Sequence, residues 1–394
     1  MKLEQQLFMD ILRAFAAEES FCLPVIDPDW EELLHLSRIQ DTEGIIGYEL
    51  MHSPHLTPEL RDVMHRCFIQ TFGTCAKRAG KMAGLVRLMN DRGIEHLLVK
   101  GYLVRELYPV PELRTFGDID FLIHLEDREK CDALLMEEGF QRTVDWEPVY
   151  SYVRKDEYYE VHTDIMEVDV SDKADYKGYF SQVWQHAVRQ EGYTFVPEIQ
   201  FHLLYLLTHL AKHITSSGAG IRLYLDIAFY IRRYRDEIDW DAFRQELAVL
   251  HPEAFANVVF AAAGQWFGVA APYSLQPLEP DFMDELLEIT LNGGVFGHYN
   301  EDRGLTVLKK EDRDSERVAK GSALLHKMFP RAGEIESRYT YLQSRPWLLP
   351  AAWLHRFVRT LDRFDEHADE AKKIMNADEE KVLRLRKFYK YMGF

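Results

Sequence analysis

The stretch that decides the fold lies in the first third of the chain and has two parts. They read Leu98-Val99-Lys100-Gly101 and Arg114-Thr115-Phe116-Gly117-Asp118-Ile119-Asp120-Phe121-Leu122-Ile123. The second part is an apolar run that opens on two aspartates one residue apart, and it predicts a strand over 118–124. Residues i and i+2 of a strand point to the same face. Asp118 and Asp120 would therefore project side by side.

Paired carboxylates of this kind indicate a cation site. Two adjacent carboxylates repel each other unless a cation lies between them, and Mg²⁺ prefers a couple of carboxylates together with phosphate oxygens. The turn at Lys100 and Gly101 adds a positive charge, a close backbone approach and the start of a helix, although many Lys-Gly pairs are ordinary turns. The combination indicates metal-assisted phosphoryl or nucleotidyl transfer.

A third acidic residue comes from a later alternating segment. The pattern over 158–168 predicts a strand, on which Glu160, His162 and Asp164 share one face. If this strand pairs beside 118–123, Glu160 completes a cluster of three carboxylates that could hold two divalent cations around a displacement at phosphorus. The alternative is an ordinary half-solvated strand face.

Composition narrows the class of protein. The chain has 394 residues, 47% of them hydrophobic and 28% charged, which is typical of a folded protein with more than one domain. A net charge of −18 makes nucleic acid an unlikely partner, because phosphate backbones are bound through Lys and Arg. The four cysteines form no CxxC pair and favour reduced thiols in a cytoplasmic protein. The longest uncharged stretch, 254–278, is interrupted by Gly and Pro and favours a buried helix over a membrane span.

Periodicity divides the chain into three parts. We expect an N-terminal helical region over 1–92, an α/β core over 93–196 and a C-terminal helical domain over 197–394. The long apolar stripe over 60–90 predicts one or two helices, and the segment 126–138 predicts a helix closed by Gly139. Strands are expected over 96–99, 118–124, 140–144, 149–154 and 158–168.

Three short motifs, taken together, carry a family resemblance. They are the turn Val99-Lys100-Gly101, the Arg-x-x-x-Asp-Ile-Asp segment from Arg114 to Asp120, and Glu160-Val161-His162. As a set they resemble the uncharacterised bacterial nucleotidyltransferase branch of the polymerase-β-type superfamily. The histidine-rich run 202–213 and the segment from Arg222 to Ile227 are similar to helices of that branch, so the resemblance extends over most of the chain.

The resemblance implies a fold, a site and a reaction. The fold would be α+β, with a small mixed nucleotidyltransferase-type sheet between an N-terminal helical region and a large C-terminal helical domain. Asp118, Asp120 and Glu160 would bind Mg²⁺ or Mn²⁺ and form the catalytic set. The further candidates for binding the nucleotide are Lys100, Gly101, Arg114, Gly117, His162 and His209. The reaction would transfer NMP from an NTP, ATP among the candidates, to an unidentified small-molecule, peptide or protein acceptor.

Two other functions stay open. In the superfamily the turn is usually Gly-Ser, with the serine bound to a phosphate, whereas here Tyr102 follows Gly101. This departure favours an inactive module that binds a nucleotide or a partner. Separately, His209 and His213 lie one helical turn apart. With Asp226 they could form the metal site of a phosphohydrolase. The alternatives without a function are that these histidines line the interior beside the sheet and that Arg114 is an exposed loop arginine.

Overall fold

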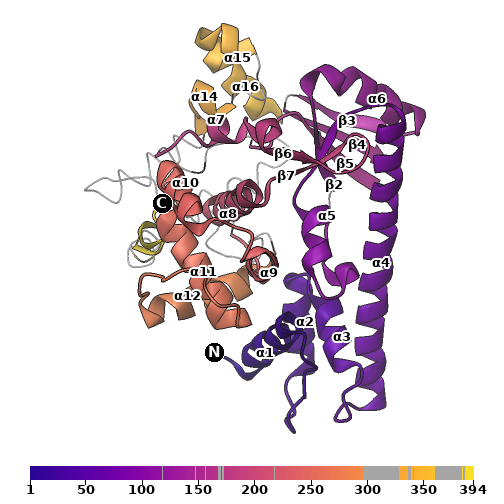
Figure 1. Ribbon diagram of the computed structural model, residues 1–394, viewed down its shortest axis with the longest axis vertical. Coiled ribbons are helices and arrows are strands. Elements are labelled where there is room, and N and C mark those ends of the chain that lie inside the picture. The colour runs from indigo at the N-terminus through magenta and orange to yellow at the C-terminus, as the bar shows by residue number, and fades with distance from the viewer. Residues whose placement is uncertain are drawn as a thin grey trace.

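The structure is a computed structural model that describes most of the chain. The described residues are 1–117, 119–146, 148–155, 157–166, 170, 173–216, 218–295, 328–335, 339, 341–359, 384 and 387–394. Helices gather below and beside one mixed sheet (Figure 1). The architecture is α+β, as the sequence predicts. Within the described residues, none of the helices has both the length and the apolar composition that a membrane crossing requires.

The N-terminal part is helical and ends in one long helix. Its helices are α1 (Leu3–Ala17), α2 (Trp30–Ile39), α3 (Glu43–Leu50) and α4 (Pro58–Asp91). Thr57 caps α4 by accepting from the backbone N–H of Leu60, and Pro58 occupies the first turn, where its missing N–H costs nothing. The stripe over 60–90 therefore forms a single helix of 34 residues.

The two halves of α4 pack against different partners. Met64 and Cys67 belong to the larger hydrophobic core, which they share with α3, whereas Met82, Leu85 and Met89 belong to a second core beneath the sheet. The helix thus runs along one side of the molecule from the N-terminal helices to the sheet (Figure 1). It joins the N-terminal region to the α/β core through continuous packing.

One seven-stranded sheet forms the centre, in the order β3-β4-β5-β2-β1-β7-β6. The strands are β1 (His96–Leu98), β2 (Ile119–Ile123), β3 (Gln141–Trp146), β4 (Val149–Arg154), β5 (Glu157–His162), β6 (Ala187–Arg189) and β7 (Thr194–Pro197). The pairs β2·β5 and β1·β7 are parallel, and the other neighbours are antiparallel. Short elements connect them: α5 (Gly101–Val104), η1 (Arg105–Leu107), η2 (Pro111–Leu113), η3 (Leu125–Asp127), α6 (Arg128–Glu137), α7 (Tyr176–Phe180) and η4 (Val183–His186).

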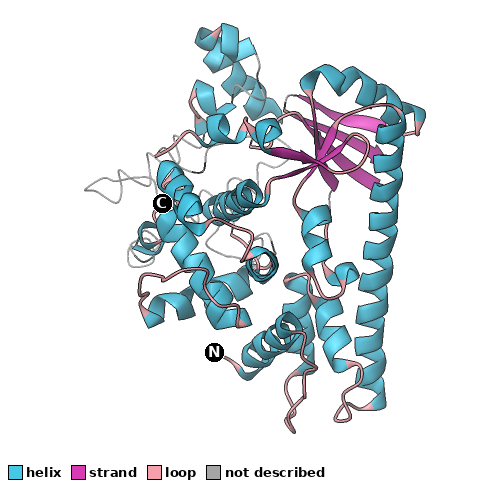
Figure 2. Ribbon diagram, in the orientation of Figure 1, coloured by secondary structure: helices cyan, strands magenta, loops and turns pink. Residues whose placement is uncertain are grey.

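The two faces of the sheet meet different helices. Leu98, Phe121 and Val161 pack with α4 and α6, while Leu97 and Leu122 join the larger core with the C-terminal helices. Figure 2 shows the strands between these two helical layers. Because successive residues of a strand alternate in direction, Asp120 and the side chain of Leu122 point toward the C-terminal helices.

The described residues of the C-terminal part form mainly helices, as the amphipathic pattern predicts. Its elements are α8 (Ile199–Ser216), α9 (Ile221–Tyr234), α10 (Trp240–Leu250), α11 (Glu253–Phe267), α12 (Pro280–Gly293), α14 (Ala332–Ile335), α15 (Tyr341–Ser344), η6 (Pro346–Leu348) and α16 (Leu349–Arg359). The stretch 254–278 contains the buried helix α11, which packs against α9 and α1. The segment 158–168 differs from its prediction, because β5 ends at His162 and the chain bends over 163–165.

Candidate active site

The centre of the candidate site is formed by two neighbouring parallel strands. In the register of β2 and β5, Asp120 lies opposite Glu160. The side chains of such paired residues stand next to each other on one face of a sheet. The pairing of the two strands, on which the sequence argument depended, is therefore confirmed. Asp120 is buried, with 9% of its surface exposed.

Two nitrogen atoms share one oxygen of Asp120. His162 Nε2 lies 3.0 Å from Asp120 Oδ1, and Lys100 Nζ lies 3.4 Å from the same oxygen. Burial alone would raise the pKa of Asp120, but Lys100 and the hydrogen bond with His162 outweigh it and hold the pKa well below its ordinary value. Asp120 is therefore a carboxylate over the whole physiological range.

Glu160 and His162 extend the cluster along β5. Tyr158 donates to Glu160 Oε1 at 2.9 Å, and His162 Nε2 lies 3.6 Å from Glu160 Oε2. Burial lowers the pKa of His162, yet its bonds with Asp120 and Glu160 raise that pKa above its ordinary value overall. Asp120, Glu160 and His162 each offer one ligand atom, and these atoms lie within 4.8 Å of one another. His162, which the sequence assigned to the nucleotide, thus also has the position of a metal ligand.

The turn after β1 brings a lysine to the same place through a strained backbone. Lys100 has φ of +51° and ψ of −128°, a conformation that side chains other than glycine rarely adopt. At Gly101 a Cβ atom would collide with the guanidinium of Arg114 and lie 3.2 Å from Phe116 Cβ. The side chain of Arg114 thus packs directly on Gly101, and the approach of a phosphate to this turn stays a prediction.

Arg114 is buried, so its interpretation as an exposed loop arginine is wrong. Its Nε and Nη2 donate to the two carboxylate oxygens of Asp226 on α9, at 3.1 and 2.6 Å. Tyr108 donates to Asp226 Oδ1 at 2.7 Å. The guanidinium therefore faces α9 rather than Asp120. A phosphate contact by Arg114 stays a prediction, and it would have to coexist with this ion pair.

Histidines of α8 approach the cluster from the helical side. His209 Nε2 and His213 Nε2 lie 3.2 Å apart. Burial lowers the pKa of His213 to about 4 and holds that of His209 well below its ordinary value, and the charge of Lys100 adds to both shifts. Both rings are therefore uncharged near neutral pH and line the interior beside the sheet. Asp226, the third residue of the phosphohydrolase interpretation, is instead paired with Arg114.

The roles predicted for two of the site residues, Asp118 and Gly117, gain no support from the structure. Asp118 lies outside the described residues, so its role as a metal ligand stays a prediction. Gly117 is exposed, and open space surrounds the position of a Cβ atom there. Tyr102, which replaces the serine of the usual turn, is half-buried and packs against the core beneath the sheet.

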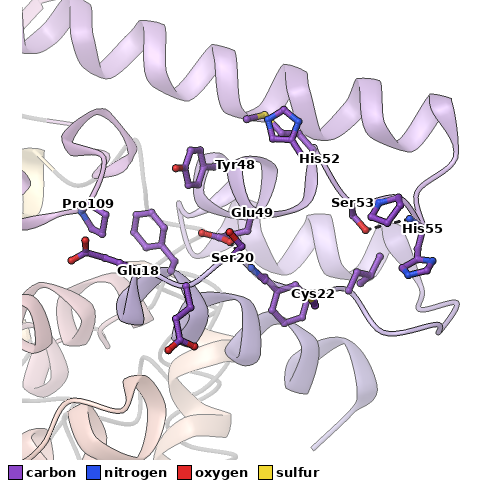
Figure 3. A pocket seen from close by; sticks show the side chains of 15 residues that line it. Glu18, Ser20, Cys22, Tyr48, Glu49, His52, Ser53, His55 and Pro109 are labelled. Atoms are coloured by element: carbon purple, nitrogen blue, oxygen red, sulfur yellow. Dashed lines mark hydrogen bonds between the residues drawn. The ribbon is translucent and has the colours of Figure 1, made fainter.

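A large cavity lies elsewhere in the molecule. It has a volume of about 650 Å³ and is bounded by the end of α1, the end of α3 and Pro109 (Figure 3). Two of the three glutamates that line it are engaged: Glu49 accepts from the backbone of Phe21, and Glu18 pairs with Arg232. No residue of the Asp120 cluster lines it, so this cavity and the candidate site lie apart.

The comparisons with known proteins agree with the cluster. Residues 27–268 match the model of a family described as an uncharacterised nucleotidyltransferase. The chain belongs to this family. The match begins before α2, ends just after α11 and includes Lys100, Asp120 and Glu160. It therefore covers both the sheet and the helices that pack on the candidate site.

Other comparisons add little. No curated protein matches the chain. The solution structure of the antibiotic-resistance factor ANT(2'')-Ia is similar at 12% identity with a TM-score of 0.34, covering 45% of this chain and 96% of that one. Nothing about the present family member follows from a similarity at this level.

Sequence reasoning missed the buried ion pair of Arg114 and Asp226. One signal was visible: Arg222 and Asp226 lie one helical turn apart on α9, among residues that are otherwise apolar and buried. Charges on the apolar stripe of a helix need partners inside the protein. The identity of those partners depends on contacts between distant segments.

Proposed function

We propose that this protein is a metal-dependent nucleotidyltransferase that transfers NMP from an NTP to an unidentified small-molecule, peptide or protein acceptor. The observation that carries the proposal is the pairing of Asp120 and Glu160 on adjacent parallel strands, with Lys100 Nζ 3.4 Å from Asp120. Membership of the nucleotidyltransferase family supports the reaction class.

The donor set fits a divalent cation. Asp120 and Glu160 supply carboxylate oxygens of the kind that Mg²⁺ and Mn²⁺ prefer, and His162 could add a nitrogen for Mn²⁺. When bound, such a cation would neutralise charge on the phosphates and stabilise the attacking and leaving oxygens. Asp118 remains a candidate for the same ligand set.

The protein's own residues would position and neutralise the substrate. Lys100 would balance charge on the triphosphate, acting as a point charge at the turn into α5. A carboxylate of the cluster would assist removal of the proton of the acceptor hydroxyl. Charges at such a site act more strongly than in water, so positioning and electrostatics supply most of the catalysis.

A second function is favoured by one observation. Tyr102 occupies the place of the phosphate-binding serine, and its ring is half-buried in the core beneath the sheet. A module that binds a nucleotide without transferring it would have the same cluster and the same turn. The two functions differ in one product, because only the enzyme releases pyrophosphate.

The test is titration calorimetry with ATP, GTP, CTP and UTP, each with and without Mg²⁺. We expect Mg²⁺-dependent binding of at least one NTP, weakened by roughly 100-fold in Asp120→Asn and in Glu160→Gln, because each substitution removes a proposed metal ligand. The matched control is Asp132→Asn, which alters a half-buried carboxylate bound to Tyr152 and Arg142 on the other side of the sheet. Equal affinity in the wild type and both site variants would refute the proposed site.

Pyrophosphate release then separates the two functions. Release in the presence of cell extract, lost in Asp120→Asn, supports the transferase. Binding with no release under any condition supports the non-catalytic module.

A further inference from the structure

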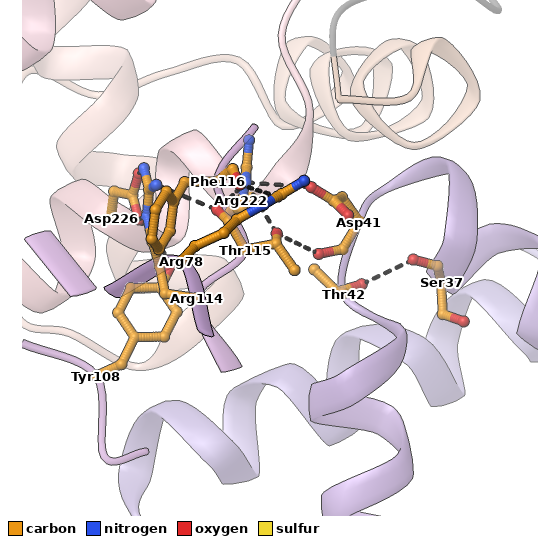
Figure 4. A network of polar contacts seen from close by, with 10 residues as sticks. All are labelled: Ser37, Asp41, Thr42, Arg78, Tyr108, Arg114, Thr115, Phe116, Arg222 and Asp226. Atoms are coloured by element: carbon orange, nitrogen blue, oxygen red, sulfur yellow. Dashed lines mark hydrogen bonds and ion pairs between the residues drawn. The ribbon is translucent and has the colours of Figure 1, made fainter. Parts of the chain in front are cut away.

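A short loop, residues 114–117, precedes β2 in the chain and is held by arginines from two different helices (Figure 4). Arg222 of α9 donates to the carbonyl oxygen of Thr115, and Arg78 of α4 donates to that of Phe116. Two successive carbonyl oxygens are thus bound by arginines of two different helices. Asp120 follows as the second residue of β2, so the position of this loop decides where its carboxylate lies.

The arginine at the start of the loop is fixed to α9 as well. Arg114 and Asp226 form a two-pronged ion pair in which both side chains are buried, and Tyr108 completes the coordination of the carboxylate. A bidentate ion pair of this kind restricts both the distance and the relative orientation of the guanidinium and the carboxylate. Arg114 cannot move without leaving a buried charge unpaired.

The corner between α2 and α3 closes the network. Arg222 Nη1 lies 3.2 Å from Asp41 Oδ2 and 2.8 Å from Thr115 Oγ1, and Thr115 in turn donates to the carbonyl oxygen of Asp41 at 2.9 Å. Segments that lie far apart in the sequence therefore converge on a single loop. We call Arg114, Asp226 and Arg222, with the loop they hold, the β2 clamp.

The β2 clamp also touches the other side of the candidate site. The guanidinium of Arg114 packs so closely on Gly101 that a Cβ atom there would collide with it. Gly101 adjoins Lys100, the residue whose Nζ reaches Asp120. One guanidinium thus sets the position of the lysine turn and, through loop 114–117, that of the aspartate strand.

We propose that Arg114, Asp226 and Arg222 are positioning residues, through which the C-terminal helical region sets the geometry of the cation site on the sheet. The inference rests on the proposed function, since it concerns the affinity of the same site. It goes further by making α9, which contributes no proposed ligand, necessary for tight binding of the metal.

The experiment measures Mn²⁺ binding to the full-length chain by the loss of the EPR signal of free Mn²⁺, well below the melting temperature of each variant. We expect Asp226→Asn to weaken Mn²⁺ binding by roughly tenfold, the lower end of what lost supporting contacts around a metal site cost. Asp226→Glu should recover part of the affinity, because it restores the charge. Arg222→Lys, which keeps the charge but loses the guanidinium that bonds Thr115 and Asp41, should show a smaller loss in the same direction and serves if Asp226→Asn does not fold.

A control separates positioning from simple stability. Asn257→Ala removes the hydrogen bonds of Asn257 with the backbone of Gln276, remote from the sheet, and should lower the melting temperature without changing Mn²⁺ affinity. Lower melting temperatures with unchanged Mn²⁺ affinity in both Asp226→Asn and Arg222→Lys would overturn the inference while leaving the proposed function intact. A wild-type protein that binds no Mn²⁺ would overturn the proposed function itself.

Discussion

Asp226 and Asp120 are both buried carboxylates, 3% and 9% exposed, yet they are bound in different ways. Asp226 has both oxygens engaged by Arg114, with Tyr108 added. Asp120 offers one oxygen to a lysine and a histidine, and a second carboxylate, Glu160, lies beside it. A buried carboxylate with both oxygens bound by one guanidinium stabilises the fold. A pair of carboxylates next to a flexible lysine and a titratable ring can exchange those partners for a cation.

The largest expected effect on stability comes from removing the carboxylate of Asp226, which is paired with Arg114. Asp226→Ala should lower the free energy of unfolding by about 3–5 kcal/mol, because it leaves the guanidinium of Arg114 buried without a counter-charge. Asp120→Ala should cost clearly less, since Lys100 can turn toward solvent and His162 can lose its proton. Urea denaturation of the metal-free protein measures both changes. An equal or greater loss of stability in Asp120→Ala would contradict the view that Asp226 stabilises the fold more than Asp120 does.

A smaller effect isolates the hydroxyl that completes the Asp226 site. Tyr108→Phe removes one hydrogen bond to a charged acceptor and leaves the ion pair with Arg114 in place. We expect a loss of about 2 kcal/mol in the free energy of unfolding, with Mn²⁺ affinity close to that of the wild type. A loss as large as that in Asp226→Ala would show that the tyrosine, rather than the arginine, is the main partner.

The smallest effect concerns a buried histidine that is uncharged at neutral pH. His202 on α8 is buried, and its Nε2 has no hydrogen-bond partner among the described residues. Burial lowers its pKa to about 3, from 6.5. Below pH 6.5 the unfolded chain binds a proton that the folded chain does not, so stability falls as the pH falls. At about pH 5.5 this amounts to about 1.4 kcal/mol.

The variant His202→Phe should remove this part of the acid sensitivity. The free energy of unfolding is measured by denaturant titration at several pH values between about 5 and 7.5 for both proteins. We expect the wild-type curve to fall more steeply on the acid side. Parallel curves would contradict the assignment of His202 as an uncharged buried ring.

The sequence was most informative where the signal is local. The apolar run after Asp118 and the alternation around Glu160 predicted β2 and β5, and the two strands pair as the cluster requires. Period-two alternation also placed Glu160 and His162 on one face. The strand predicted over 158–168 was too long, because alternation alone does not mark the bend after His162. Asp164 therefore lies beyond the strand.

The contacts that surround the site depend on long-range packing. Arg114 and Asp226 are 112 residues apart, and no spacing rule links a loop arginine to a helix in another part of the chain. The role of His162 between two carboxylates also depends on strand order, since it faces Asp120 only because β5 lies next to β2. Burial then decides the charge of the neighbouring histidines, which composition leaves undetermined.

The most direct test of the central claim follows the label of an NTP. The protein is incubated with Mg²⁺ and cell extract, together with NTPs labelled on either the α- or the γ-phosphate, and the recovered molecules are separated. Nucleotidyl transfer predicts an acceptor that carries the α-label and not the γ-label, and that is lost in Asp120→Asn. An acceptor that gains the γ-label, or one that gains the α-label equally in Asp120→Asn, would contradict the account.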